Sequence, residues 1–278
     1  MVPELPIPIP PELDAAFLAA RAGADIVSHF FRHGVSIRGK QSYNLVTDAD
    51  IESERAIVRQ IGQRFPDHAI LSEEEHSERK AAEHLWVIDP LDGTNNFAHQ
   101  VPQFAVSIAY FHQGQPKIGV VLDPLGGDCF FAVAGQGAYC GSTRLRVDAA
   151  VRLDQALIGV GFYYDRGLIM EETLLAIRDL FRRNIHGIRR FGAASLDLCW
   201  VAAGRFSGFF EFELSSWDFA AGALIVQEAG GIVTTCQGHP LPLEKSSVLA
   251  SNGPLHAAIL GCIQPHYECC LGNSTSDG

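Results

Sequence analysis

Trp86-Val87-Ile88-Asp89-Pro90-Leu91-Asp92-Gly93-Thr94-Asn95-Asn96-Phe97 is the stretch of this 278-residue chain that is most informative about its fold. The apolar run before Asp89 predicts a buried strand, and Pro90 should end its ladder because proline has no backbone N–H to donate. Gly93, directly after Asp92, permits a tight turn. Both carboxylates are therefore expected at one strand end. If they bind a metal ion there, the Leu91 carbonyl is free to point at the same ion.

Oxygen ligands of this kind suit Mg²⁺ or Mn²⁺. The backbone amides of Gly93 and Thr94 are placed to bind a phosphate group. Taken alone, however, Asp89 and Asp92 are better explained as turn and helix-cap residues. Acidic residues at the edges of three other apolar elements favour a cation site instead: Asp50 after Leu45-Val46-Thr47, Glu73 and Glu74 after Ala69–Ser72, and Asp218 before Phe219–Val226.

The composition excludes several classes of protein. A formal net charge of −11, with no basic stripe or block, argues against a protein that binds nucleic-acid backbones. Seven scattered cysteines with no C-x-x-C pair indicate neither a disulfide scaffold nor a zinc cage, and the eleven histidines show no H-E-x-x-H spacing. The N-terminus does not look like a signal peptide, and no apolar run is long enough for a bilayer. A cytoplasmic location without membrane contact is therefore expected.

The pattern of elements predicts an α/β fold, a layered αβαβα sandwich in which an antiparallel half precedes a mixed half. One compact domain is expected over residues 12–267, with subdomains at about 12–150 and 151–267. It lies between a Pro-rich arm (1–11) and a polar tail (268–278). Four individual expectations are a helix from Glu12, a loop at 38–42, a strand at 145–147 and a closing helix over 254–263.

The motifs resemble those of the inositol monophosphatases, within a superfamily that includes fructose-bisphosphatases and nucleotide phosphatases. The resemblance covers about residues 12–265. Three blocks carry it: Leu45–Asp50, Asp89–Phe97, and Trp217-Asp218-Phe219-Ala220-Ala221-Gly222 running on to Glu228-Ala229-Gly230-Gly231. The second and third blocks, in this order and spacing, form a highly specific signature.

The resemblance implies a site with two or three Mg²⁺ ions, with Mn²⁺ as a substitute. One ion would be bound by Glu73, Asp89 and the Leu91 carbonyl. A second would be bound by Asp89, Asp92 and Asp218, so that Asp89 bridges the pair, and a weaker third would also use Glu73. Thr94 and Glu73 would polarise the attacking water, while Asp50 and Glu74 would act from behind them, Asp50 through a hydrogen bond to Thr94. Lys40 would lie in a mobile loop over the site.

The same resemblance implies a substrate side. Asp92, Gly93 and Thr94 would contact the phosphate, and Gly192, Ala193, Ala194 and Glu211 would contact the polyol. Ala193 replaces a hydroxyl side chain found in several family members, which removes one polar contact. Asp197 is expected on the surface of its helix, and Arg189 and Arg190 at a solvated strand end.

The expected function is a Mg²⁺-dependent phosphomonoesterase acting on a small polyol or sugar phosphate, with inositol 1-phosphate as the first candidate. Histidinol phosphate, fructose 1,6-bisphosphate and adenosine 3′,5′-bisphosphate remain alternatives within the same chemistry. A catalytically silent binding or regulatory protein on the same fold is the alternative of a different class. A homodimer and inhibition by Li⁺ are expected from the resemblance alone.

Overall fold

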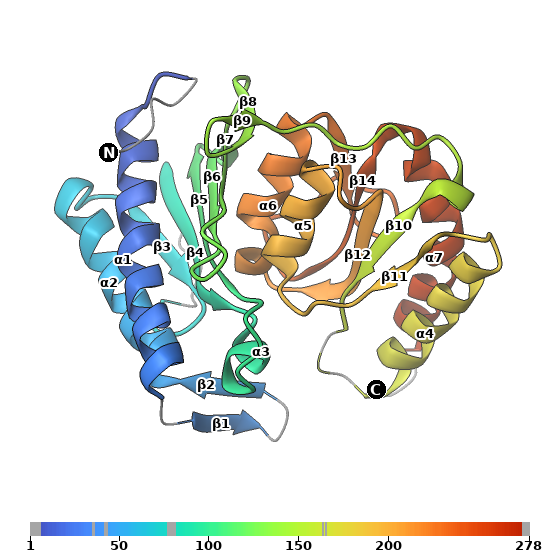
Figure 1. Ribbon diagram of the computed structural model, residues 1–278, viewed down its shortest axis with the longest axis horizontal. Helices are drawn as coiled ribbons and strands as arrows, with labels where there is room; N and C mark the ends of the chain where they lie inside the picture. The colour runs from blue at the N-terminus through green and yellow to red at the C-terminus, as the bar shows by residue number, and fades with distance from the viewer. Residues whose placement is uncertain are drawn as a thin grey trace.

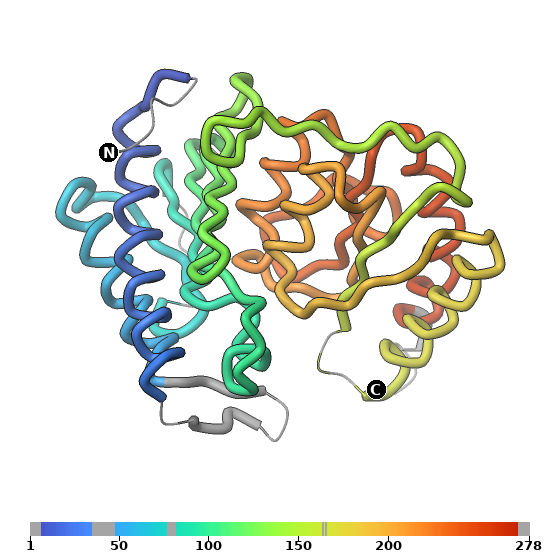
Figure 2. Tube along the Cα trace, in the orientation of Figure 1, coloured from blue at the N-terminus to red at the C-terminus, as the bar shows by residue number. Residues whose placement is uncertain are grey.

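The computed structural model describes residues 7–34, 37–41, 44–76, 82–162, 164 and 166–273, and gives the backbone alone at 37–41, 44–47 and 272–273. The chain path runs from the blue N-terminal half on one side of the molecule to the yellow and red C-terminal half on the other (Figure 2). The helices are α1 Pro11–His33, α2 Asp48–Arg64, α3 Thr94–Ala98, α4 Leu168–Phe181, α5 Ala194–Ala202, α6 Ser216–Glu228 and α7 Gly253–Asn273, with a short 3-10 turn η1 at Leu153–Gln155.

Two main sheets and a hairpin contain the strands. The hairpin pairs β1 (Ile37–Gln41) with β2 (Asn44–Thr47). The seven-stranded sheet has the order β3-β4-β5-β6-β7-β8-β9 and is antiparallel except for the β3–β4 pair. Its strands are β3 Ala69–Ser72, β4 His84–Asp92, β5 Ala105–His112, β6 Gln115–Leu122, β7 Cys129–Val133, β8 Gly137–Cys140 and β9 Thr143–Arg144. The mixed five-stranded sheet has the order β11-β10-β12-β14-β13, with β10 Leu157–Val160, β11 Gly187–Arg189, β12 Gly208–Leu214, β13 Gly231–Thr234 and β14 Ser246–Asn252.

The elements stack in five layers, which confirms the predicted αβαβα sandwich (Figure 1). Helices α1 and α2 cover one face of the seven-stranded sheet, α5 and α6 lie between the sheets, and α4 and α7 cover the outer face of the second sheet. Three apolar cores fill the spaces between the layers, and the central core joins both sheets to α5 and α6. No described helix is long and apolar enough to span a bilayer.

Strand β4 brings the acidic motif to the central layer. Its side chains alternate as in any strand: Val87 packs in the central core, while Trp86 and Ile88 pack under α1 and α2. Asp89 pairs with Ser107 of β5, but Asp92 pairs with Ala105, so three steps on β4 match two on β5. This extra residue is a β-bulge. Asp89 and Asp92 would face opposite sides of a regular strand, and the bulge turns both toward the space between the sheets.

Several sequence-based expectations need correction. Pro90 does not end β4, because the bulge absorbs the residue that cannot donate. The loop expected at 38–42 lies largely in β1, and the side chain of Lys40 falls outside the described residues. The strand expected at 145–147 is wrong, since the last strands of this sheet are β8 and β9. The closing helix α7 extends to Asn273 instead of ending at 263.

Candidate active site

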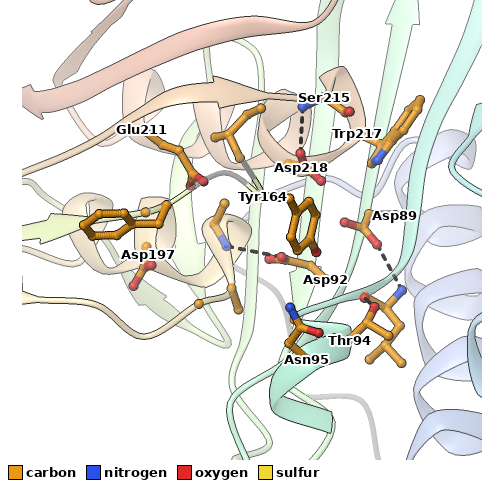
Figure 3. A pocket seen from close by; sticks show the side chains of 18 of the residues that line it. Asp89, Asp92, Thr94, Asn95, Tyr164, Asp197, Glu211, Ser215, Trp217 and Asp218 are labelled. Atoms are coloured by element: carbon orange, nitrogen blue, oxygen red, sulfur yellow. Dashed lines mark hydrogen bonds between the residues drawn. The ribbon is translucent and has the colours of Figure 1, made fainter. Parts of the chain in front are cut away.

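A cavity of about 270 Å³ opens between the two sheets, at the end of β4 (Figure 3). Asp89 and Asp92 reach it from β4, Asp218 from α6 and Glu211 from β12. The predicted site residues that line it are Glu73, Asp89, Leu91, Asp92, Gly93, Thr94, Gly192, Ala193, Ala194, Glu211 and Asp218. Acidic side chains from three separate elements, and Glu73 from the segment after β3, thus line one cavity.

Burial and mutual repulsion dominate the electrostatics of these acids. Asp89 is 1% exposed, and its pKa is raised well above the usual range by burial, then by the charges of Glu73, Asp92 and Asp218. Burial, followed by the charge of Asp92, raises the pKa of Asp218 in the same way. Such a cluster binds protons or cations in preference to remaining a set of bare negative charges. Its donors are all carboxylate or carbonyl oxygens, which fits a hard divalent cation.

Asp92 has a second role as a cap for α5. Its carboxylate accepts hydrogen bonds from the Ala194 amide (3.2 Å), the Ser195 amide (2.7 Å) and the Ser195 hydroxyl (2.5 Å). Burial raises the pKa of Asp92 to about 6, and the bonds from Ser195 and Ala194 oppose the shift. Among the described residues, no three of these active-site acids have oxygens within 4.8 Å of one another. The carboxylates therefore surround the cavity, and a cation shared by Asp89, Asp92 and Asp218 would have to draw them together.

The turn after β4 fixes Thr94. Gly93 has a φ of 95°, and a Cβ there would lie 2.9 Å from the Gln103 carbonyl oxygen, so a larger residue would strain the turn. The Thr94 hydroxyl lies 2.9 Å from Asp50 Oδ1 and 3.0 Å from the Leu91 carbonyl oxygen. Asp50 is buried behind Thr94 and does not line the cavity. At the start of α3, the first amides have no partner within the helix.

Hydrogen bonds to Glu54 of α2 hold the segment that carries Glu73 and Glu74. The Glu54 carboxylate accepts hydrogen bonds from the Ser72 hydroxyl (2.7 Å) and from the amides of Glu74 and Glu75 (both 2.8 Å). It also contacts His76 Nδ1 at 2.8 Å. Glu73 lines the cavity, whereas Glu74 does not. Glu54 is fully buried, and sequence reasoning missed it because Ser53-Glu54-Arg55 reads as an exposed helix face.

Glu211 stands at the far wall of the cavity. It is buried, and burial raises its pKa to about 8 against the lowering effect of the Arg190 charge. A Cβ at Gly161 would lie 1.7 Å from Glu211 Oε2, so the absence of a side chain there makes room for the carboxylate. Gly161 directly follows β10, which pairs in parallel with β12, and this explains why the two residues meet.

Several residues of the cavity were not predicted from the sequence. Asp197 was expected on the surface but is 1% exposed and lines the cavity, because α5 is buried between the two sheets. Its place one turn after Ala194, on the same face of α5, was the available signal.

Tyr164 lies among the acids, where burial and the charge of Glu73 raise the pKa of its phenol (Figure 3). Arg190 is exposed as expected, yet it also lines the cavity. The remaining unpredicted lining residues are Asn95, Gly161, Phe162, Leu214, Ser215 and Trp217.

The raised pKa values predict how stability depends on pH in the presence of a chelator. In the folded chain Asp92 and Glu211 bind protons more tightly than in the unfolded chain. Their protonation therefore favours folding below about pH 4, and this contribution is lost as pH rises through about 6 for Asp92 and about 8 for Glu211. We expect the free energy of unfolding in EDTA to fall between pH 5 and 8, by about 1.4 kcal/mol from Asp92 alone, because only the part of its pKa shift between pH 5 and about 6 lies in this interval. Urea unfolding at pH 5 and at pH 8 measures this change in the free energy of unfolding. Equal or greater stability at pH 8 would contradict the prediction.

Known proteins of one family resemble this chain over most of its length. The family model described as "Inositol monophosphatase family" matches residues 11–268. Among curated relatives, the "Nus factor SuhB" of Pseudomonas aeruginosa is 43% identical, covering 92% of this chain and 97% of that protein. The "Inositol-1-monophosphatase" of Caulobacter vibrioides is 40% identical, covering 89% and 97%. The solved structure of the extragenic suppressor protein suhB from Bartonella henselae is 34% identical with a TM-score of 0.85, covering 91% and 98%. The chain therefore belongs to the inositol monophosphatase family.

Proposed function

We propose that this phosphatase-family protein is a Mg²⁺-dependent phosphomonoesterase that hydrolyses a small polyol or sugar phosphate, with inositol 1-phosphate as the first candidate. The observation that carries the proposal is the set of four acids, Glu73, Asp89, Asp92 and Asp218, that line one cavity beside the Gly93–Thr94 turn. A phosphate monoester is itself dianionic, so a cavity lined by acids can accept it only with cations.

The proposed ligands are those that the family resemblance implies. Glu73, Asp89 and the Leu91 carbonyl would bind one ion, and Asp89, Asp92 and Asp218 a second; Glu73 would also contribute to a weaker third. When bound, such ions neutralise phosphate oxygens and lower the pKa of a water molecule. Mn²⁺ would substitute for Mg²⁺, because both prefer oxygen ligands.

The chain's own groups would orient the reactants. Asp50 and the Leu91 carbonyl lie within hydrogen-bond distance of the Thr94 hydroxyl, so its oxygen is fixed at the cavity wall. Thr94 and Glu73 would hold the attacking water, with Glu73 accepting its proton. The amides of Gly93 and Thr94 would donate to the phosphate. Glu74 would contribute through its backbone, which Glu54 holds in place.

Glu211 would bind hydroxyl groups of the substrate, beside Gly192, Ala193 and Ala194. We expect Gly161→Ala to raise KM for inositol 1-phosphate about twofold to tenfold, because the new Cβ would displace the Glu211 carboxyl group and remove its hydrogen bonds to the substrate. KM measured by phosphate release tests this. Gly62→Ala is the control, since a Cβ at Gly62 meets nothing within 4 Å. An unchanged KM in Gly161→Ala would remove Glu211 from the substrate site.

The proposed activity is tested by phosphate release from a panel: inositol 1-phosphate, histidinol phosphate, fructose 1,6-bisphosphate and adenosine 3′,5′-bisphosphate. We expect turnover with Mg²⁺, none in EDTA, and recovery when Mg²⁺ is restored. Preference for another member of the panel would reassign the substrate and keep the chemistry. No release from any ester with Mg²⁺ or Mn²⁺ would refute the proposed activity.

A second candidate is a non-catalytic role, because relatives at up to 43% identity are named Nus factor. The two roles do not exclude each other, and the intact set of acids favours retained catalysis. A homodimer remains a prediction from the family resemblance, a cytoplasmic location a prediction from the N-terminal sequence and the lack of a long apolar run, and inhibition by Li⁺ a prediction from the family resemblance. Measurement of the molecular mass in solution tests the homodimer, and a Li⁺ titration of turnover tests the inhibition.

A further inference from the structure

A second cluster of metal-ligating side chains lies at the opposite end of β4. His84 begins β4 and stands directly across from His112, the last residue of β5. Residues opposed in this way on antiparallel strands have their Cβ atoms only about 4.5–5.5 Å apart. The two imidazole rings lie 4.8 Å apart at 21°. Glu83 completes the group: one ligand atom from each of Glu83, His84 and His112 lies within 4.8 Å of the others.

Neighbouring groups hold these three side chains in place. His84 Nδ1 contacts the Tyr110 hydroxyl at 2.6 Å, which fixes the imidazole ring through one nitrogen. Glu83 Oε1 lies 3.3 Å from His112 Nε2 and accepts a hydrogen bond from Gln113 Nε2 at 3.1 Å. The Gln113 amide also donates to the Glu83 carbonyl at 2.7 Å. Histidine ligands in metal sites are typically oriented in this way by a hydrogen bond at the other ring nitrogen.

His68 supports the cluster from the other side of His84. Its ring stacks on that of His84 at 4.3 Å and 7°, and its Nδ1 accepts a hydrogen bond from Trp86 Nε1 at 3.1 Å. His68 therefore packs the His84 ring in place and uses one of its own nitrogens for Trp86.

We propose that Glu83, His84 and His112 form a site for a transition-metal ion of the Zn²⁺ class. Two imidazoles and one carboxylate suit Zn²⁺, whereas the oxygen-only cavity suits Mg²⁺. The two sites are distinct, because Asp89 lies five residue steps along β4 from His84, a span of about 17 Å. A bound ion would join β4 to β5 and would stabilise the folded chain by an amount that rises with the logarithm of the ratio of ion concentration to dissociation constant. Because this site shares no ligand with the phosphatase cavity, the inference stands or falls independently of the proposed function.

Zn²⁺ titration calorimetry on the full chain tests this site, with excess Mg²⁺ present to occupy the acidic cavity. We expect one Zn²⁺ equivalent to bind, and its affinity to fall at least about tenfold in His84→Gln and in His112→Gln, because each removes a ligand. Glu83→Gln, at an exposed position, should weaken binding without a risk to folding. Circular dichroism confirms that each variant is folded.

His29→Gln is the matched control. His29 and His33 also form a stacked pair on α1, with ring centroids 4.4 Å apart, but among the described residues no third metal-ligating group lies within 4.8 Å to complete a site with them. Zn²⁺ affinity should therefore be unchanged in His29→Gln. With Cu²⁺ as a spectroscopic probe, electron paramagnetic resonance should show couplings from two imidazole nitrogens in the parent chain and from one in His112→Gln. No Zn²⁺ binding by the parent chain, or affinity unchanged in both histidine variants, would overturn the proposal.

Discussion

Asp89→Asn is expected to lower kcat/KM for phosphate release at least about a thousandfold, the upper range for removing one preorganised electrostatic group. Asp89 is the proposed ligand of two ions, and its carboxylate is almost completely buried among three other acids. Asn keeps the side-chain shape and can still accept the Leu91 amide, which bonds Asp89 Oδ1 at 3.0 Å. The fold should therefore survive. In EDTA at pH 8 the variant should even unfold at a higher temperature, because a repelled negative charge has been removed.

Asp123→Asn provides a matched control for this experiment. Asp123-Pro124-Leu125 repeats the Asp-Pro-Leu sequence of the active site, and Asp123 Oδ1 likewise accepts the amide two residues on, at 3.0 Å. Asp123 is only half-buried and does not line the cavity, so its replacement should change kcat/KM by no more than about twofold. Steady-state kinetics of both variants test the predicted change in kcat/KM, and thermal unfolding tests whether the fold survives. Near-normal turnover in Asp89→Asn would refute the proposed metal site.

The sequence carried most of the information about which acids meet. Asp89, Asp92 and Asp218 stand in local motifs, and each follows or precedes an apolar element, so their place at element ends could be predicted. The β-bulge could not be predicted, because Pro90 is a normal signal for the end of a strand. Yet this bulge, and not a strand end, is what turns Asp89 and Asp92 to the same side.

Residues that depend on tertiary packing were harder to predict. A helical aspartate is usually exposed, and only the burial of α5 between two sheets places Asp197 in the cavity wall. Strand β14 lies in a serine-rich stretch, Ser246–Asn252, without an alternating pattern, yet it is an interior strand of its sheet and pairs with β12 and β13. The same limit applies to His84 and His112, which are far apart in sequence and are paired only by the register of β4 and β5.

Glu54→Gln is expected to raise the Mg²⁺ concentration for half-maximal activity about tenfold to a hundredfold, the usual effect of losing a group that orients a metal ligand. One Glu54 oxygen accepts from Ser72 and the Glu74 amide, and the other from the Glu75 amide and faces His76. A glutamine amide in either orientation must turn its NH₂ group toward a backbone N–H.

The segment around Glu73 would then shift, since a buried unsatisfied donor costs about 1–3 kcal/mol. Mn²⁺ binding followed by electron paramagnetic resonance separates this effect from a general loss of stability, because it reports metal affinity without turnover. Glu52→Gln, an exposed glutamate on the same helix that pairs with Arg55 at 3.0 Å, should leave Mn²⁺ affinity unchanged. If Glu54→Gln bound Mn²⁺ as the parent does, Glu54 would stabilise the fold without positioning Glu73. The four hydrogen-bonding groups that meet its carboxylate, all from residues 72–76, favour positioning, because they fix the backbone on both sides of Glu73.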